Sequence, residues 1–208
     1  MTTITAPLLD SSVLPMVELL ALCLDGHLYR VGDFFAPAEA PDAPELRASA
    51  FGRSVSTWMV ADRESAAWIH GTRSVPPPLP QVCIPPHRRG GLAAAAVDAC
   101  HRSLRPDETV SLGAVHVTTP LRTAVDLLSL PGTFDDQQAL EVCHLLALAG
   151  MTPAETDERL RMSRRKGCAL ARSRLPMVAG ARLPGPVSPA RSALGPVGPR
   201  PGQPPVTR

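Results

Sequence analysis

The sequence predicts an α/β protein of the α+β class. A small mixed sheet with flanking helices is expected between a partial winged-helix-like N-terminus and a set of C-terminal helices that end in a disordered tail. Hydrophobic residues make up 44% of the 208 residues, which is enough for one core, but only 3% are aromatic, so this core must rest on Leu, Val and Ala. Short strand-like runs between Pro and Gly turn signals, followed by well-capped helical patterns, predict the order of the elements.

A helix followed by a β-hairpin is predicted at the N-terminus. The apolar run Val13–Leu24 indicates the helix. The segments His27–Arg30 and Asp33–Ala36 flank a Val-Gly turn and indicate the two strands. This order matches the second half of a winged helix-turn-helix, with Tyr29 and Arg30 on the wing.

The predicted N-terminal helix lacks the side chains that read DNA bases. It contains no Arg, Lys, Asn or Gln, and Asp10, Glu18 and Asp25 lie in or beside it, where they would repel phosphates. A complete winged domain also needs one or two further helices before the recognition helix. The hairpin therefore has two interpretations, a nucleic-acid wing or a small structural element. The apolar run is too short for a membrane span and no basic segment precedes it, so it does not indicate a signal peptide.

The central part of the chain is predicted to hold the sheet and two helices. After a hinge at Ala36–Pro44, helices are expected at Glu45–Phe51 and at Asp62–His70, and Gly71 closes the second of them. Strands are expected at Thr57–Val60, Gln81–Ile84, Val97–Ser103, Thr109–Leu112 and Ala114–Val117. The last two strands are expected to pair across a tight turn at Gly113.

The segment TTPLRTAVDLL, residues 118–128, carries the sharpest helix start in the chain. Thr119 is a suitable N-cap, and Pro120 stands at the first helical position, where its missing N–H costs nothing. An apolar stripe follows at the i, i+3, i+4 and i+7 positions, formed by Leu121, Ala124, Val125 and Leu128. A helix over Pro120–Leu130 is therefore predicted.

Arg122 is the unexpected residue of this helix, because a cation in the first turn opposes the helix dipole. Asp126, one turn later, is its nearest possible partner. One interpretation is a surface ion pair that contributes little to stability. The other is an arginine held for a specific contact, directed inward or toward a partner.

Two more helices and a tail complete the prediction. One helix is expected at Phe134–Ala149, with Thr133 and Asp136 in capping-box spacing, and another begins at Thr152, with Glu155 at its third position. Residues 176–208 contain nine Pro and five Gly without hydrophobic periodicity, which predicts disorder. The chain is accordingly divided into units at 1–37, 45–175 and 176–208.

The net charge of +2 conceals an uneven distribution. All 19 acids lie at or before residue 160, where they outnumber 11 arginines, whereas residues 161–208 carry nine Arg and one Lys. Arg161, Arg164, Arg165 and Lys166 form the best cationic cluster and are candidate nucleic-acid contacts, together with Tyr29 and Arg30. The alternative for the cluster is ordinary cations at a helix C-terminus. The basic tail has three interpretations: a contact with nucleic acid, a contact with the acidic part of the chain, or a merely solvated segment.

No catalytic, cofactor or metal site is predicted. The five cysteines are scattered without C-x-x-C spacing, which favours reduced thiols in the cytoplasm over a disulfide framework or a zinc site. Cys100 and His101 are neighbours on an expected strand and should face opposite sides of the sheet. The basic glycine pair in Arg89–Leu92 does not follow a phosphate-binding strand, and no local motif assembles an acid–base pair or a nucleophile.

Four segments, taken in order, resemble the AbiEi-type antitoxin family of abortive-infection, type IV toxin–antitoxin systems that is common in actinobacteria. Leu24–Val31 is similar to the wing of its N-terminal module, and Ala61–Gly71 to a family helix that contains Ala66, Ala67 and Gly71. Gln81–Pro85 is similar to its central strand. Val117–Leu128 is similar to a family segment that includes Thr119, Pro120, Arg122 and Asp126. The resemblance covers roughly residues 15–175.

The resemblance implies a non-enzymatic cytoplasmic antitoxin and transcriptional regulator without cofactors. Such proteins repress their own promoter through a winged helix and counter a nucleotidyltransferase-like toxin without forming a tight complex with it. Two alternatives remain, a stand-alone DNA-binding regulator and a truncated, non-catalytic remnant of a protein fused to a Vsr-like endonuclease. The incomplete winged helix separates this chain from the family pattern, and the sequence does not define an oligomeric state.

Overall fold

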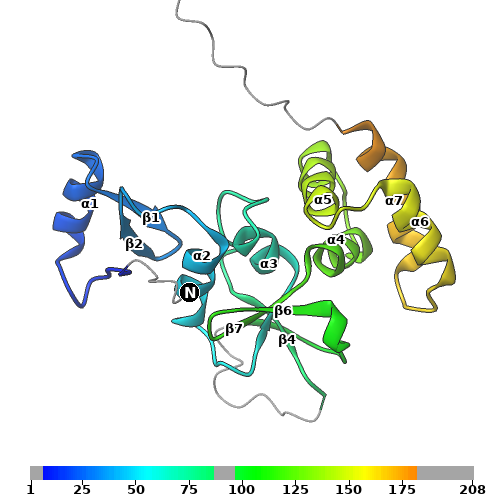
Figure 1. The fold of residues 1–208 in the computed structure, drawn as a ribbon, viewed down its shortest axis with the longest axis horizontal. Helices are drawn as coiled ribbons and strands as arrows, with labels where there is room; N and C mark the ends of the chain where they lie inside the picture. The colour runs from blue at the N-terminus through cyan, green and yellow to red at the C-terminus, as the bar shows by residue number, and fades with distance from the viewer. Residues whose placement is uncertain (1–6, 87–96, 182–208) are drawn as a thin grey trace, which may run out of the picture.

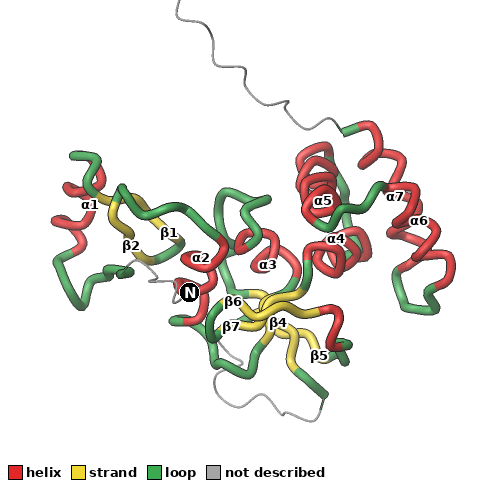
Figure 2. Tube along the Cα trace, in the orientation of Figure 1, coloured by secondary structure: helices red, strands yellow, loops and turns green. Residues whose placement is uncertain are grey.

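The computed structural model describes residues 7–86 and 97–181 and has the predicted mixed α/β architecture. Figure 1 shows an N-terminal helix and hairpin at one end, a five-stranded sheet with two helices in the middle, and four helices at the other end. Figure 2 shows the strands gathered beneath α3 and α4. The part of the predicted C-terminal tail from residue 182 onward and the Arg89–Leu92 loop lie outside the described residues.

The N-terminal unit consists of α1 (Met16–Leu24), β1 (Leu28–Val31) and β2 (Phe34–Pro37). The strands pair antiparallel as predicted, and Gly32 makes the turn with a positive φ of 62° that favours glycine. One face of the hairpin joins α1 in a small core of Leu19, Leu28 and Phe35. The helix begins three residues later than predicted, after Pro15.

The five-stranded sheet has the order β5-β4-β3-β7-β6. Its strands are β3 (Val60–Ala61), β4 (Gln81–Ile84), β5 (Asp98–His101), β6 (Thr109–Leu112) and β7 (Val115–Thr118). The β3–β7 and β4–β5 pairs are parallel, and the β3–β4 and β6–β7 pairs are antiparallel. The predicted strand at Thr57–Val60 is wrong for its first three residues, because ladder pairing begins only at Val60.

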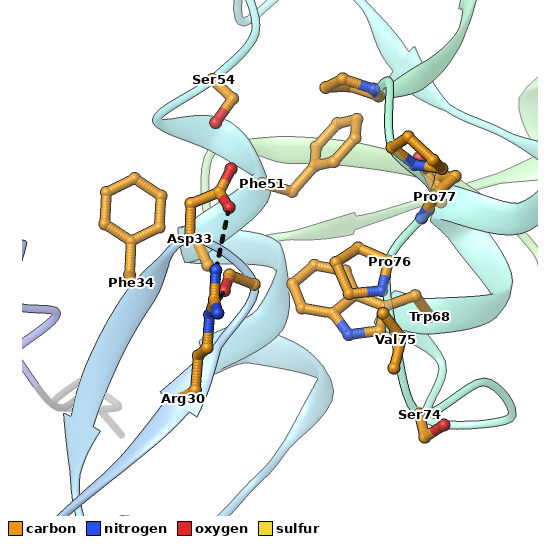
Figure 3. A pocket seen from close by; sticks show the side chains of 15 residues that line it. Arg30, Asp33, Phe34, Phe51, Ser54, Trp68, Ser74, Val75, Pro76 and Pro77 are labelled. Carbon is orange, nitrogen blue, oxygen red and sulfur yellow. Dashed lines mark hydrogen bonds and ion pairs between the residues drawn. The ribbon is translucent and has the colours of Figure 1, made fainter. Parts of the chain in front are cut away.

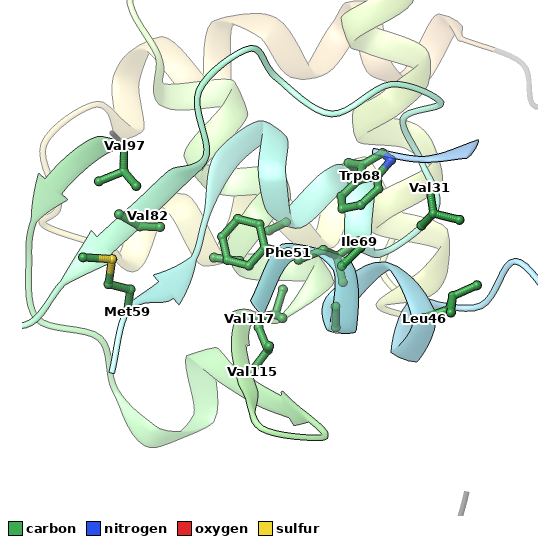
Figure 4. Close-up of a cluster of buried hydrophobic side chains, with 14 of the residues drawn as sticks. Val31, Leu46, Phe51, Met59, Trp68, Ile69, Val82, Val97, Val115 and Val117 are labelled. Carbon is green, nitrogen blue, oxygen red and sulfur yellow. The ribbon is translucent and has the colours of Figure 1, made fainter. Parts of the chain in front are cut away.

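The main core lies on one face of this sheet. Helices α2 (Pro44–Gly52) and α3 (Arg63–Ile69) cover that face. Val82 and Val117 of the strands share the core with Phe51 and Ile69 (Figure 4), and Ile84 belongs to the same cluster. Alternation along β4 and β5 sends Cys83 and Cys100 to the opposite face, since these two residues are register partners. Cys100 and His101 therefore face opposite sides of the sheet, as predicted.

Four helices form the C-terminal end of the described chain: α4 (Pro120–Ser129), α5 (Asp136–Leu148), α6 (Pro153–Met162) and α7 (Cys168–Gly180). They share a second core in which Ala124 and Leu128 of α4 meet Leu145 of α5 and Ala171 of α7. Of the stripe predicted for α4, Ala124 and Leu128 are buried in this core, whereas Leu121 and Val125 are partly buried against it.

Two predictions about this region need correction. The predicted capping box of α5 is wrong in its residues, since the Asp135 carboxylate accepts from the Gln138 N–H at 2.8 Å and the Gln138 side chain accepts from the Asp135 N–H at 3.0 Å. The predicted disorder from residue 176 is also wrong over its first five residues, because α7 continues through Pro176 to Gly180. The α6 start at Thr152, with Glu155 reaching back to it, is confirmed.

Candidate functional site

Arg122 is buried rather than exposed, so the surface-pair interpretation is wrong and the inward contact is confirmed. Its side chain is 8% exposed and that of Asp126 is 5% exposed. Arg122 Nε donates to Asp126 Oδ2 at 3.0 Å, and Nη1 donates to Glu108 Oε1 at 3.0 Å. The Thr119 hydroxyl accepts from the Arg122 N–H at 3.4 Å, which confirms the predicted N-cap.

Arg122, Asp126 and Glu108 belong to a longer chain of alternating cations and carboxylates on the polar face of the sheet. We call it the arginine–carboxylate chain; its members, in order of contact, are Arg63, Asp62, Arg102, Asp126, Arg122, Glu108 and Arg165. Its links measure between 2.6 and 3.0 Å. Because every buried charge faces an opposite charge, the chain avoids the large penalty of an unpaired ion in the interior.

Burial dominates the titration of Asp126. Desolvation raises the pKa of this carboxyl above its ordinary value, although Arg122 and Arg102 both lower it. For Arg102, burial lowers the pKa, but Asp126, Cys100 and Asp62 more than reverse this, and its pKa is raised. The guanidinium therefore holds its proton firmly.

Asp62 connects the arginine–carboxylate chain to two thiols. One acceptor atom of Asp62 and the sulfur atoms of Cys83 and Cys100 all lie within 4.8 Å of one another, a spacing that a metal ion could bridge. The Cys100 thiol donates to Asp62 Oδ2 at 2.9 Å, and its pKa is raised first by its hydrogen bond with Cys83 and then by burial. Thiol and carboxylate ligands suit zinc.

The surroundings of this trio oppose a cation. Arg102 Nη2 donates to Asp62 Oδ2 at 2.9 Å and Arg102 Nε donates to the Cys100 sulfur at 3.0 Å, so a guanidinium already contacts two of the three ligands. Arg63 Nε donates to the other Asp62 oxygen at 3.0 Å. A bound metal would have to displace Arg102, and the trio is better explained as part of the arginine–carboxylate chain.

Arg63 occupies a strained backbone conformation beside Asp62. Its φ is +46°, the one positive value among the non-glycine residues that the structure describes. Such a conformation costs roughly 1 kcal/mol in a non-glycine residue. The strain aims the guanidinium at Asp62 and at Asp98, whose Oδ2 atom lies 2.8 Å from Arg63 Nη1.

The predicted basic cluster does not form one surface. Arg165 is bidentate to Glu108, with Nη1–Oε1 at 2.6 Å and Nη2–Oε2 at 3.0 Å, and so belongs to the arginine–carboxylate chain. Arg161 pairs with Asp157 at 2.8 Å on the surface of α6. Arg164 and Lys166 are exposed and have no acidic partner among the described residues.

The predicted wing residues have different environments. The Tyr29 hydroxyl donates to the Ala40 carbonyl at 3.0 Å and is partly buried, which is a structural role. Arg30 is exposed, with 66% of its side chain accessible, and lies 3.7 Å from Asp33. Figure 3 shows this pair at the edge of a cavity of about 470 Å³, opposite Trp68 and Pro76.

The remaining family-like residues have packing roles. Ala66 and Ala67 of α3 are fully buried, and their small side chains fit into the main core and the C-terminal core respectively. Gly71 ends α3 with a φ of +81°, as the predicted C-terminal stop requires. His70 Nε2 lies 2.7 Å from the Thr118 carbonyl and joins α3 to the start of the TTPLRTAVDLL segment.

Helix α1 exposes an apolar stripe that the sequence analysis did not identify as a site. Val13 and the α1 residues Met16, Val17, Leu20 and Leu24 are between 46 and 90% exposed. Residues 13, 17, 20 and 24 follow the alternating spacing of four and three that puts side chains on one helix face. A helix that is apolar on nearly all sides is normally covered by other structure, and the described residues leave this face of α1 uncovered.

Sequence reasoning missed most of the arginine–carboxylate chain and the thiol pair. Glu108, Arg102 and Asp62 come from three separated segments, and only the strand register brings Cys83 beside Cys100. One local signal was present, since a buried-strand pattern that ends in an acid, Val60-Ala61-Asp62, places a charge at the edge of the core. No signal within a single segment indicated Arg165 as the partner of Glu108.

No family model matches the chain, and no curated protein matches its sequence. Within the described residues, no helix is long and apolar enough to cross a membrane.

Proposed function

We propose that this protein is a non-enzymatic regulator of the antitoxin class, acting in the cytoplasm within a type IV toxin–antitoxin system. The observation that carries the proposal is the convergence of three of the four family-like segments in one structural unit. The Ala61–Gly71 segment forms the end of β3 and α3, the Gln81–Pro85 segment forms β4, and the Val117–Leu128 segment forms the end of β7 and α4. Segments separated by tens of residues pack directly on one another.

The contacts between these segments support a shared structural role. Strand β3 pairs with both β4 and β7, and Ala67 of α3 shares a core with Ala124 of α4. The arginine–carboxylate chain runs through the same unit, where Asp62 and Asp126 are linked through Arg102. Its carboxylates are all engaged by arginines, an arrangement suited to fixing a surface rather than to transferring protons.

Co-expression with any nucleotidyltransferase-like toxin that the neighbouring genes encode tests the proposal. Growth should be rescued by the wild-type chain and lost with Arg122→Leu, which removes the centre of the arginine–carboxylate chain. Arg161→Leu is the matched control, since Arg161 pairs only on the surface of α6. Failure of the wild-type chain, present at normal levels, to restore growth contradicts the proposal.

A DNA-binding regulator is the second candidate, and the exposed Arg30 at the hairpin turn favours it. The apolar stripe and Glu18 of α1 speak against insertion of that helix into a groove, because phosphates attract cations. Gel shifts on the upstream region at several salt concentrations would test it. Binding that weakens with increasing salt and with Arg30→Glu is expected. Binding that neither change affects would exclude the hairpin as the DNA-binding element.

A further inference from the structure

A second cavity, of about 340 Å³, opens where the end of β5, α4 and the α6–α7 connection meet. Four cationic side chains line it, those of Arg102, Arg122, Arg165 and Lys166. Asp126 is the one acid in the lining. We call this space the cationic cavity. Its walls come from segments more than 60 residues apart, so the concentration of charge is a product of the fold.

The arginines of the cavity retain hydrogen-bond donors. A guanidinium carries five N–H groups. Arg165 donates one N–H from each terminal nitrogen to Glu108, so its Nε–H and two further N–H groups are not used in this pair. Arg102 donates once from each of its three nitrogens, to Cys100, Asp126 and Asp62, which leaves two. These donors are free to bind an incoming anion without breaking the arginine–carboxylate chain.

The carboxylates of the arginine–carboxylate chain compensate the three arginines of the lining, because Asp62, Asp126 and Glu108 pair with them. Both oxygens of Asp126 already accept from arginine, Oδ1 from Arg102 at 2.6 Å and Oδ2 from Arg122 at 3.0 Å. Lys166 adds a charge that no described carboxylate neutralises, because it is exposed and forms no ion pair in the described part of the chain. Lys166 therefore supplies the one positive charge of the lining that the described carboxylates leave uncompensated.

Two further groups favour an anion in the same place. The hydroxyl of Ser103 lines the cavity and is able to donate a hydrogen bond. Helix α7 begins at the cavity wall with Cys168, and its N-cap Gly167 supplies no side-chain cap. The positive end of the helix dipole adds to the cationic side chains, although it would not by itself define a site.

We propose that the cationic cavity binds the phosphate group of a small phosphorylated molecule. Arginine forks match the tetrahedral oxygens of a phosphate, and Lys166 adds a positive charge that no described carboxylate compensates. The volume lies at the lower end of small-molecule pockets, which suits one phosphate group with a compact substituent rather than a run of nucleic acid. This binding activity goes beyond the proposed antitoxin role and does not depend on it.

Calorimetric titration of the full-length protein with pyrophosphate, at constant ionic strength, tests the proposal. The wild-type protein should bind saturably, and Lys166→Glu should weaken binding by about ten-fold or more, as expected for a lost charge-assisted hydrogen bond replaced by repulsion. Lys166→Arg should retain most of the affinity. Because Lys166 is exposed and unpaired, neither variant should change the melting temperature without ligand.

Arg164→Glu is the matched control. It makes the same change of two charges two residues away, outside the cavity lining, and should alter the affinity less than about two-fold at physiological salt, where screening is strong. An equal loss in both variants would show general attraction to the basic segment and overturn the site. Absence of saturable binding to wild type also overturns it. Tighter binding of a 5′-phosphorylated oligonucleotide than of pyrophosphate would replace the small ligand by a nucleic-acid end.

Discussion

The N-terminal unit and the arginine–carboxylate chain differ in the kind of side chain that each exposes and buries. The N-terminal unit leaves Val17 78% exposed and Leu24 90% exposed, whereas the arginine–carboxylate chain buries Arg122 and Asp126 almost completely. Apolar surface exposed to water is unfavourable, and covering it with another surface lowers the free energy. Buried charges are tolerable only with fixed partners. The first region is therefore open to change on association, and the second is committed to one arrangement.

The largest expected effect concerns the committed region. Arg122→Ala should lower the free energy of unfolding by about 3–5 kcal/mol, because it leaves Glu108 and Asp126 without their shared partner in the interior. Urea denaturation followed by circular dichroism measures this loss. Arg30→Ala, at an exposed pair, should cost at most about 1 kcal/mol. Equal losses in the free energy of unfolding of the two variants would contradict the difference between the buried and the exposed ion pairs.

A core substitution in the N-terminal unit comes next. Leu19 is fully buried between α1 and the hairpin, and Leu19→Ala should cost about 2–4 kcal/mol if the unit folds together with the rest of the chain. Hydrogen exchange should locate the loss. If exchange accelerates only over residues 16–37 while the global unfolding transition stays in place, the unit opens independently, and the contrast becomes one between two cooperative units.

The contributions of a buried and of a surface carboxyl group to the free energy of unfolding should change in opposite directions as the pH falls. Burial raises the pKa of Glu141 above its ordinary 4.5, although Arg73 lowers it. Its folded form therefore binds a proton more readily than its unfolded form, and the stability of wild type relative to Glu141→Gln should increase as pH falls from 7 toward 4.5. Urea titrations of both proteins at each pH provide the difference.

Asp157 is the surface counterpart of this experiment. A hydrogen bond from Arg172 lowers the pKa of Asp157 below its ordinary 3.8, so its contribution is present above that value and is lost as pH falls further. The stability of wild type relative to Asp157→Asn should consequently shrink below about pH 4. A common sign for the two comparisons contradicts the assignment of burial as the dominant cause at Glu141.

Substitutions in the exposed apolar stripe of α1 should have the smallest effect on stability. They should have a measurable effect on association. Leu20→Ser should change the free energy of unfolding by less than about 1 kcal/mol, because nearly half of that side chain is already exposed. Light scattering at increasing protein concentration should show less self-association than in wild type. Leu22→Ser is the comparison, since Leu22 packs against the N-terminal core and its loss should act on stability instead.

The sequence predicts well those elements whose signals are local. The caps of α4 and α6 were predicted because Thr119-Pro120 and Thr152-Pro153 carry the whole signal within one turn. Helix α7 was missed because Pro176 lies inside it and its apolar pattern is weak. A signal was nevertheless present, since Ala171, Leu175 and Val178 follow the i, i+4, i+7 spacing and are all buried.

The candidate site was less predictable than the fold. The pairing of Arg122 with Asp126 follows from helical spacing, but its burial depends on Glu108 and Arg165, which lie 14 residues before and 43 residues after Arg122 in the sequence. An ion pair on a helix surface and one in the interior have the same local pattern. Only tertiary packing distinguishes them, and the pattern within one helix does not report it.

The near-exclusive use of arginine has a practical consequence for chemistry in solution. Lys166 is the single lysine of the chain, so apart from the N-terminal amine it is the one target for amine-directed acylation. It stands at the rim of the cationic cavity, while the arginines around it do not react with such reagents. An acyl fluorophore would therefore attach at one defined side chain, and a protein acetylase acting on this chain would find a single position at which to remove charge.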